Sequence, residues 1–246
     1  MTTEILIMWS AVTLYAVSAV LAVVGLVFRK PGIERVSVAV ASAGLAVHAF
    51  GIGFRWVRVG HGPCLGFYEV VSSYAFVGVA AFLILLVRKR SLQPLAAAVM
   101  PLAFLTLGGA MLAPKSELAI TGTLASWWLA IHVAFAKLAY GSFITAFCLA
   151  VLFLVRDWRR SEGDPLLGKV VPEALDDLSY KFVAAGFLFL GVMIAAGAIW
   201  ANEAWGRYWG WDPIETWSLI SWIAYALVLH ARLTLGWRGR RFAWAA

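Results

Sequence analysis

The chain has 246 residues, of which 63% are hydrophobic and 13% are charged, and its mean hydropathy is +0.85. Soluble domains carry about 45–50% apolar and about 25% charged residues, so this composition excludes an ordinary soluble protein and indicates a polytopic membrane protein. The formal net charge of +7 does not indicate a nucleic-acid partner, because the basic residues cluster at the ends of apolar runs. Membrane proteins carry their topology signals at those positions.

The termini and the cysteines narrow the class further. The N-terminus lacks the basic region and the small-residue cleavage site of a signal peptide, so the first apolar run is expected to remain as a helix. The two cysteines, Cys64 and Cys148, form no C-x-x-C pair, and Cys148 lies inside an apolar run. A thiol–disulfide enzyme and a structural disulfide are therefore not expected.

Seven stretches are long and apolar enough to form membrane-spanning helices, each of which needs about 20 mostly apolar residues. They are Ile5–Phe28, Val36–Phe54, Glu69–Val87, Leu92–Ala113, Trp127–Val155, Tyr180–Trp200 and Pro213–Leu235. The predicted fold class is all-α and polytopic, with residues 1–246 forming a single integral membrane domain.

Basic clusters follow the first, third, fifth and seventh spans, which all end on the same side of a seven-span arrangement. The clusters are Arg29, Lys30 and Arg35; Arg88, Lys89 and Arg90; Arg156, Arg159, Arg160, Lys169 and Lys181; and Arg238, Arg240 and Arg241. By the positive-inside rule, the N-terminus is predicted to be external and the C-terminus cytoplasmic. Residues 156–177 then form a cytoplasmic loop, and residues 200–217 lie outside.

The external segment 200–217 is rich in tryptophan and reads W-A-N-E-A-W-G-R-Y-W-G-W-D-P-I-E-T-W. Tryptophan often gathers at membrane interfaces as an aromatic belt, which is the alternative explanation. A belt explains Trp205, Trp209 and Trp211 poorly, because they share a polar segment that is expected to be an ordered loop. Large aromatic rings in such a loop are suited to stacking on a flat, hydrophobic ligand, and Arg207 could pair with a carboxylate of that ligand.

The seventh span has a clear start. Asp212 suits the N-cap, Pro213 the first helical position, and Glu215 completes a D-x-x-E capping box. Helix capping is therefore the preferred role of both carboxylates. His230 follows about 17 residues later, or about 25 Å along the helix, in the inner half of the membrane.

Three of the four histidines lie in or beside spans, where ionisable residues are most often functional, although a lone histidine can also serve only as an interhelical hydrogen-bond partner. The fifth apolar run holds about 29 residues and would reach about 43 Å, more than the bilayer core of about 30 Å. Counting inward from Arg156 therefore places His132 at the outer interface, on the side of the tryptophan-rich segment. His48 lies nearer the outer side, and His61 reads as a solvated loop residue.

The string W-G-R-Y-W-G-W-D-P-I-E-T-W-S-L-I-S-W, from Trp205 to Trp222, resembles the WWD signature of haem-handling proteins. Its D-P-x-E-T-W continuation and the trailing Y-A-L-V-L-H-A-R resemble the CcsA/ResC family of cytochrome c biogenesis proteins. The strings G-H-G-P-C-L-G-F-Y-E and W-L-A-I-H-V-A-F-A-K-L-A-Y agree with this resemblance, which covers most of the chain after about His48.

The resemblance implies a component of a holocytochrome c synthase that moves haem b across the membrane. It presents the haem externally to the C-x-x-C-H segment of apocytochrome c for thioether attachment. Implied partners are a CcsB/ResB-type membrane protein, a thiol-reducing thioredoxin-like protein and the lipid bilayer of a bacterial inner membrane or a thylakoid. His132 and His230 correspond to axial ligands of an external and a membrane-held haem. Trp205, Trp209, Trp211, Trp217, Asp212, Arg207 and His48 are the remaining candidate haem-binding residues.

Two alternatives remain open at this stage. The first is a haem carrier or exporter similar to CcmC, which hands haem to a separate ligase. The second is a non-haem polytopic transporter or scaffold, in which the tryptophans form only a belt. Members of the family usually continue into a further span with a second external histidine, whereas this sequence ends at Ala246, so the second external ligand is unassigned.

Overall fold

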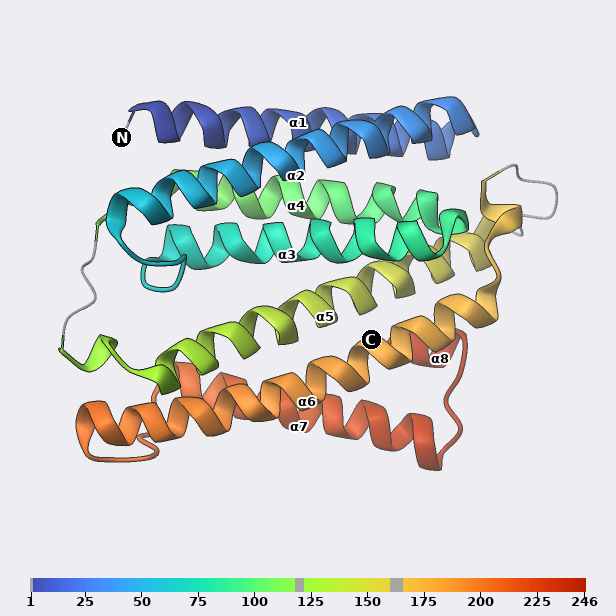
Figure 1. The fold of residues 1–246 in the computed structure, drawn as a ribbon. Helices are drawn as coiled ribbons and strands as arrows, with labels where there is room; N and C mark the ends of the chain where they lie inside the picture. The colour runs from blue at the N-terminus through green and yellow to red at the C-terminus, as the bar shows by residue number, and fades with distance from the viewer. Residues whose placement is uncertain (1, 118–121, 160–165) are drawn as a thin grey trace. The chain divides into compact units, whose positions relative to one another are not determined.

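The computed structural model describes residues 2–117, 122–159 and 166–246, and the secondary structure of these residues is helical, with no strand among them. The long helices are α1 (Thr2–Val27), α2 (Pro31–Val59), α3 (Phe67–Arg88), α4 (Ala96–Leu112), α5 (Trp127–Arg159), α6 (Pro172–Trp205) and α7 (Pro213–Thr234) (Figure 1). Short helical turns are η1 (Arg90–Leu95), η2 (Gly122–Leu124), η3 (Leu167–Lys169) and α8 (Arg240–Ala243).

Among the described residues, seven helices, with η1 and α4 counted as one, are long and apolar enough to cross a membrane. The predicted fold class, an all-α polytopic integral membrane protein, is thereby confirmed. Which ends of the helices face the cytoplasm rests on the basic clusters alone and stays a prediction.

Two helices extend well beyond the predicted spans. α2 adds a turn or more at each end of the expected range 36–54, and α6 runs over Pro172–Trp205 rather than Tyr180–Trp200. Hydropathy marks only the apolar part of a helix, whereas helical hydrogen bonding continues through polar residues until the backbone turns away. Gly60, with φ of 81°, provides that turn after α2, because glycine adopts the left-handed conformation without a steric penalty.

These extensions correct two predicted loops. The expected cytoplasmic loop 156–177 is shorter, because α5 continues to Arg159, α6 begins at Pro172, and η3 lies between them; residues 160–165 lie outside the described residues. The expected loop within the tryptophan-rich segment is also shorter. Residues 200–205 form the last turn and a half of α6, and only residues 206–212 connect α6 to α7.

Residues 1–246 are predicted to form one membrane domain, within which the structure groups the chain into two compact units. Unit 1 comprises Met1–Ala119 and Val151–Leu175, and unit 2 comprises Ile120–Ala150 and Asp176–Ala246. The division therefore falls within the helices α5 and α6. Each unit is described by itself below.

In unit 1, α1 packs along α2 and α4, and α3 packs on α4 (Figure 1). The buried positions of α2 are Glu34, Ser37, Ala41, Gly44, His48, Gly51 and Arg55. They alternate by three and four residues, which is the spacing of one buried helical face. This face is polar or small rather than apolar, as is usual where membrane helices pack closely and the lipid-facing side carries the apolar residues.

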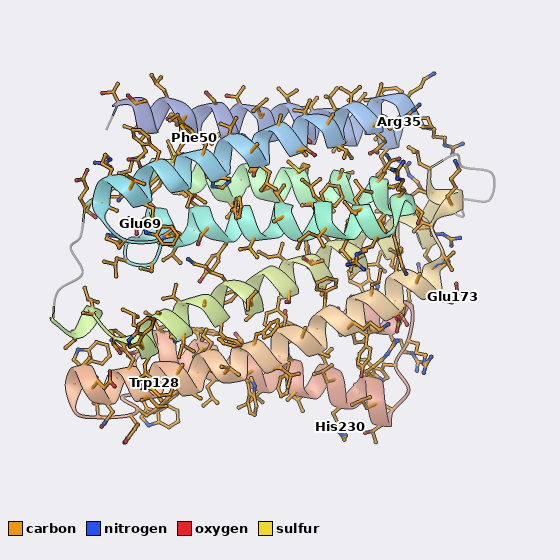
Figure 2. The ribbon with its side chains drawn as sticks, in the orientation of Figure 1. Arg35, Phe50, Glu69, Trp128, Glu173 and His230 are labelled. Atoms are coloured by element: carbon orange, nitrogen blue, oxygen red, sulfur yellow. The ribbon has the colours of Figure 1, made fainter. Side chains whose placement is uncertain are left out.

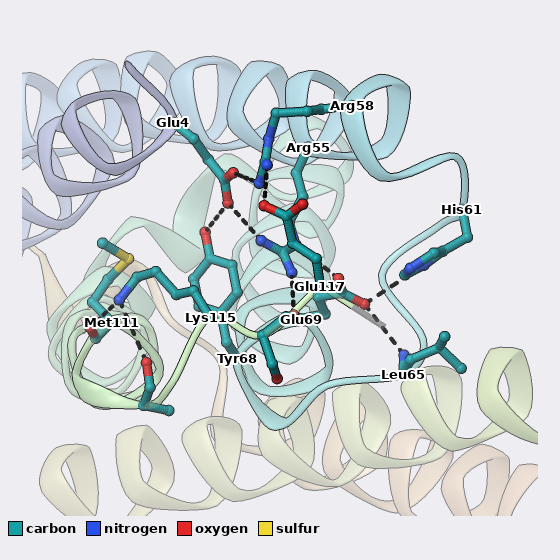
Figure 3. A network of polar contacts seen from close by, with 12 residues as sticks. Glu4, Arg55, Arg58, His61, Leu65, Tyr68, Glu69, Met111, Lys115 and Glu117 are labelled. Carbon is teal, nitrogen blue, oxygen red and sulfur yellow. Dashed lines mark hydrogen bonds and ion pairs between the residues drawn. The ribbon is translucent and has the colours of Figure 1, made fainter. Parts of the chain in front are cut away.

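A network of buried charges closes one end of unit 1 (Figure 3). The guanidinium of Arg55 donates to Glu69 Oε1 at 2.7 Å and to Glu4 Oε1 at 3.1 Å, and all three side chains are buried. Arg58 pairs with Glu4 and with the exposed Glu117. Because each charge has an opposite partner, the network links α1, α2, α3 and the segment after α4 without leaving an isolated buried ion.

In unit 2, the core is built from aromatic rings that fit against α6. Phe143 of α5 stacks on Tyr225 of α7, with ring centroids 3.8 Å apart and an interplanar angle of 6°. A Cβ atom on Gly186 of α6 would lie 2.6 Å from the Phe143 ring, so the absence of a side chain there lets the ring approach the helix. Trp222 of α7 stacks on Phe187 in the same core.

Candidate functional site

The start of α5 is tied to the end of α6 by side-chain hydrogen bonds within unit 2. Ser126 Oγ donates to Glu203 Oε2 at 2.7 Å and accepts from the backbone N–H of Trp128 at 3.2 Å, so it caps α5. The indole N–H of Trp200 donates to the carbonyl of Thr123 at 2.9 Å. These bonds hold the first turns of α5 against the last turns of α6.

His132 lies one turn and a half into α5, with its ring against α6. Its Nδ1 lies 2.9 Å from the carbonyl oxygen of Met193. A carbonyl can only accept, so Nδ1 carries the proton and Nε2 carries the lone pair. A Cβ atom on Gly197 would lie 2.6 Å from Nδ1, so glycine at this position gives the imidazole its room.

The connection between α6 and α7 turns sharply at both ends. Gly206 adopts φ of 70° directly after α6, and Trp211, although not a glycine, adopts φ of 57° directly before the N-cap Asp212. A bulky residue at positive φ is strained by about 1–3 kcal/mol and persists only where its surroundings hold it. Residues 206–212 therefore form a fixed connection.

The predicted capping box is confirmed in part. Asp212 Oδ1 accepts from the backbone N–H of Glu215 at 2.8 Å, as expected of an N-cap. Glu215 Oε2 accepts instead from the N–H of Gly210 at 2.7 Å, two residues before the expected position. The left-handed conformation of Trp211 brings the backbone N–H of Gly210 within hydrogen-bonding distance of Glu215. The spacing of the capping box alone does not predict this bond.

These elements line a pocket in unit 2 of about 170 Å³ that is open to solvent. Helical residues of its wall include His132, Met193 and Gly197. Its aromatic residues are Trp200, Trp205, Tyr208 and Trp209, and its polar ones include Asp212, Glu215 and Ser218. This volume is smaller than the range of about 300–1,000 Å³ typical of small-molecule and cofactor sites, so a larger ligand would extend out through the open side.

The comparisons with known proteins agree with one another. Residues 64–246 match the family model described as cytochrome C assembly protein. The chain is 35% identical to the cytochrome c biogenesis protein CcsA of Synechococcus sp. (strain CC9311), over 95% of this chain and 88% of that protein. It is 34% identical to CcsA of Guillardia theta, over 79% of this chain and 72% of that protein. This chain belongs to the CcsA family.

A solved structure supports the fold. The chain is similar to the cytochrome c haem lyase CcmF with a TM-score of 0.75 and 15% sequence identity, over 98% of this chain and 43% of CcmF. At this identity the likeness concerns the fold alone. The CcsA resemblance predicted from the WWD string is confirmed, and the role of the family is cytochrome c biogenesis.

The structure brings together some of the residues that the CcsA resemblance indicates and separates others. His132, Trp205, Trp209 and Asp212 line the pocket. Arg207, Trp211 and Trp217 do not line it, and all three are exposed. The position of a residue within the signature therefore does not predict whether its side chain faces the pocket, because the chain reverses direction between α6 and α7.

Arg207 lies beside the pocket rather than in it. Its guanidinium folds over the backbone of Gly210, where any side chain would overlap it. Gly210 is thus the second glycine that makes room for a candidate site residue of this CcsA family member. The arrangement keeps the positive charge close to the connection 206–212.

The two remaining candidate histidines lie away from the pocket. His230 is exposed near the far end of α7 from the pocket, 3.4 Å from Thr234 Oγ1 (Figure 2). His48 belongs to unit 1 and is fully buried, with Tyr15 Oη 3.2 Å from its Nδ1 and Ser72 Oγ 2.9 Å from its Nε2. Both ring nitrogens of His48 have hydrogen-bond partners, which is the arrangement of an interhelical link. Their roles in haem binding stay predictions.

The pocket also includes residues that sequence reasoning missed. Met193 and Gly197 belong to an apolar stretch of α6 that carries no signal for a site, although glycines along one helix face do indicate close packing. Tyr208 belongs to the CcsA-like signature and Trp200 to the tryptophan-rich segment 200–217, and both could have been included on that ground. Glu215 was assigned to capping alone, whereas it both caps α7 and lines the pocket.

Proposed function

We propose that the pocket of unit 2 binds haem b, with His132 as an axial ligand of the iron, and presents it to apocytochrome c. Haem is the cargo of this site, and its two vinyl groups are joined to the thiols of a C-x-x-C-H segment. The protein acts with a CcsB/ResB-type membrane partner as a component of a holocytochrome c synthase, and the pocket faces the external side.

The observation that carries the proposal is the hydrogen bond between His132 and Met193. It fixes the imidazole tautomer with the lone pair on Nε2, which is the arrangement in which histidine most often binds a metal. Histidine ligands almost always donate their other N–H to a carbonyl or a carboxylate, and here the helix α6 supplies that acceptor. His132 lines the pocket, so Nε2 is the ring nitrogen left to act as a ligand there.

The residues that line the pocket are chemically suited to a porphyrin. Trp205, Tyr208 and Trp209 offer flat aromatic surface, of which each ring buries about 150–250 Å² when covered. The indole Nε1 of Trp209 is buried without a hydrogen-bond partner among the described residues. A buried donor without an acceptor is costly, and an acceptor on a bound ligand would remove that cost.

The residues of the pocket act by holding and orienting the cargo rather than by a side-chain nucleophile. The reacting thiols belong to apocytochrome c, so the task of the pocket is to fix the ring and expose one edge. Holding two reactants in the right geometry converts a bimolecular step into an effectively unimolecular one and can lower the barrier by about 7–11 kcal/mol. Sites on helices position ligands better than sites on loops, and His132 lies on a helix.

His230 is proposed to bind a second haem, held within the membrane on its way outward. The His230 side chain is exposed, which leaves its ring accessible to a partner, and an ionisable side chain within the membrane is favoured only with such a partner. In this arrangement the partner protein contributes the other ligand.

The test is the absorption spectrum of the protein purified with its partner, with the haem quantified as its pyridine haemochrome. Wild type is expected to carry haem b, and His132→Ala and His230→Ala are each expected to lose part of it. Added imidazole should restore the spectrum of His132→Ala, because it replaces only the missing ligand. Full haem content in both variants would refute the proposal.

A second measurement separates ligation from carriage. Haem attachment to a C-x-x-C-H peptide by the purified complex, with the thiols reduced, supports a synthase. Haem binding without attachment would support instead a carrier that hands haem to a separate ligase.

A further inference from the structure

The chain folds back on unit 2 after α7 ends. The N–H of Trp237 donates to the carbonyl of Ala231 at 3.1 Å, and Gly239, with φ of 59° and ψ of −127°, then turns the backbone into α8. Glycine is the residue that adopts this conformation without a steric penalty. Phe242 of α8 is fully buried against residues of α5 and α6 (Figure 1). Residues 235–246 therefore have a fixed place on unit 2.

A largely buried ion pair holds this segment. Arg232 donates to Asp176 Oδ1 at 2.9 Å, and the same oxygen accepts from the N–H of Gly239 at 2.8 Å. The guanidinium of Arg232 also lies 5.1 Å from the ring centroid of Tyr180 and 4.9 Å from that of Phe242. Asp176 is thus engaged by Arg232 and by the backbone, and it does not compensate the arginines farther along the segment.

Three arginines of the segment lie at the surface. Arg238, Arg240 and Arg241 are all exposed and fall within four consecutive residues. Arg238 and Arg241 form no ion pair with any acidic residue that the structure describes. Like charges this close in the sequence repel one another, so an anion that contacts them stabilises the segment. Residues 235–246 therefore present a positive surface.

The position of this surface at the end of a span indicates which anion it meets. The 22 residues of α7 reach about 33 Å, close to the hydrocarbon core of about 30 Å, so the segment after α7 lies at the level of the lipid headgroups. Leu235 and Trp244 stand on either side of the arginines in the sequence, and both are exposed. Tryptophan is enriched at this interface. An acidic protein or a nucleic acid offers these two side chains no apolar contact, whereas a phospholipid offers a phosphate and an acyl chain together.

We propose that residues 235–246 form a binding site for an anionic phospholipid such as phosphatidylglycerol, with Arg238 and Arg241 on the headgroup phosphate. Arginine suits this role because its planar guanidinium donates two parallel hydrogen bonds to a phosphate. Leu235 and Trp244 contact the upper part of the acyl chains. The positive-inside rule concerns only a bias in loop charge, whereas here the folded segment holds the two arginines in place.

The charge of the lipid provides the selectivity. Phosphatidylcholine carries the same phosphate, but its choline cation compensates the charge. Each basic residue near an anionic headgroup favours binding by about fivefold, so Arg238 and Arg241 together favour phosphatidylglycerol over phosphatidylcholine by about 30-fold.

The experiment measures which lipid contacts the segment, with the whole chain in phosphatidylcholine nanodiscs. A bimane label is attached at Ala245→Cys, beside Trp244, in a background of Cys64→Ser and Cys148→Ala. Phosphatidylglycerol or phosphatidylcholine with a nitroxide on the acyl chain is added in small amounts, and quenching of the label reports contact. Phosphatidylglycerol is expected to reach half-maximal quenching at a mole fraction about 30-fold lower.

Removing the charges should remove the preference. Arg238→Gln and Arg241→Gln are each expected to reduce it by about fivefold, and the double variant should bring it close to one. Both positions are exposed, so the fold should be retained, which thermal unfolding checks. Lys181→Gln is the matched control, because it removes an exposed positive charge that already pairs with Asp177 at 2.7 Å. It should leave the preference within about twofold of wild type.

The outcomes are distinguishable. Equal quenching by the two lipids in the labelled chain, or an unchanged preference in the double variant, would overturn the inference. Inorganic phosphate at constant ionic strength should leave the quenching unchanged; if it displaces the lipid, the site takes free phosphate and the inference fails. The measurement needs no haem, and His132→Ala should give the same result, so the inference stands apart from the proposed function.

Discussion

Gly197→Ala tests whether the contact between α5 and α6 positions the haem ligand. The new Cβ would lie 2.6 Å from Nδ1 and 2.9 Å from Cε1 of His132, whereas ordinary contacts begin near 3.4 Å. The imidazole must therefore move by about 0.8 Å, which disrupts its bond to the Met193 carbonyl. Alanine gains about 0.5–1 kcal/mol over glycine in a helix, but overpacking costs about 1–3 kcal/mol, so the net change in stability is small and unfavourable.

The effect on haem should be larger than the effect on stability. Loss of a bond that orients a metal ligand typically lowers metal affinity by about 10–100-fold, and a displacement near 1 Å has a comparable effect on positioned chemistry. The assay is haem titration of the apoprotein, followed in the Soret band, with thermal unfolding measured in parallel.

Gly186→Ala is the matched control for this prediction. Gly186 lies on α6, as Gly197 does, but away from the pocket. Its new Cβ would lie 2.6 Å from the Phe143 ring of α5. It should destabilise unit 2 to a similar extent and leave haem affinity within a factor of about three of wild type, a change below 1 kcal/mol. Equal losses of haem affinity in the two variants would refute the reasoning, since packing of α6 in general would then control binding.

Three further predictions concern the rest of the chain. Arg55→Met leaves the buried Glu69 without its arginine partner and leaves Glu4 with Arg58 alone, and it should cost about 3–5 kcal/mol of stability, visible as a large fall in the unfolding temperature. Gly210→Ala displaces the guanidinium of Arg207 and should weaken the binding of haem b more than that of its dimethyl ester, as measured by titration. The guanidinium of Arg58 lowers the pKa of Glu117. The ion pair between Arg58 and Glu117 therefore stabilises the fold above the unfolded-state pKa of about 4.3. This stabilisation is lost as the pH falls through the lower pKa of Glu117 in the folded state. The unfolding temperatures of wild type and Glu117→Gln should accordingly converge below about pH 4.

The spans and the site region could be predicted because they depend on local properties of the sequence. Hydropathy locates a helix wherever about 20 apolar residues follow one another, and Asp212 with Pro213 marks a helix start by capping chemistry. Counting residues from a basic cluster placed His132 at the level of the tryptophan-rich segment, and the structure places both at one pocket. Each of these inferences needs only one helix at a time.

The buried network of unit 1 could not be predicted in the same way, because it depends on which helix faces which. Glu4 and Arg55 are far apart in the sequence, and each alone reads as an interfacial charge. A signal was nevertheless present. The buried residues of α1 include Glu4, Met8, Ala11, Tyr15, Ser18, Ala22 and Gly25, which follow the same alternation of four and three as those of α2. Two antiparallel helices with this pattern pair Glu4 with Arg55 and Gly25 with Glu34.

The orientation of individual aromatic rings in the signature could not be predicted from the sequence either. Trp209 and Trp211 are two residues apart and perpendicular in the structure, yet one lines the pocket and the other is 70% exposed. The positive φ of Trp211 separates them, and nothing in its side chain favours that conformation. Backbone strain of this kind is imposed by the surrounding structure, so it becomes visible only there.

Along α6, glycines recur at positions where a ring from another helix packs closely, and this pattern affects how the site is held. Gly186, Gly191 and Gly197 each lie against a ring from a neighbouring helix, and a side chain at any of them would contact Phe143, Trp222 or His132 respectively. The candidate iron ligand is therefore positioned by the same close packing that builds the core. Substitutions in the connection 206–212 should therefore change haem affinity while the spectrum keeps the signature of histidine ligation, whereas Gly197→Ala should change the ligation itself.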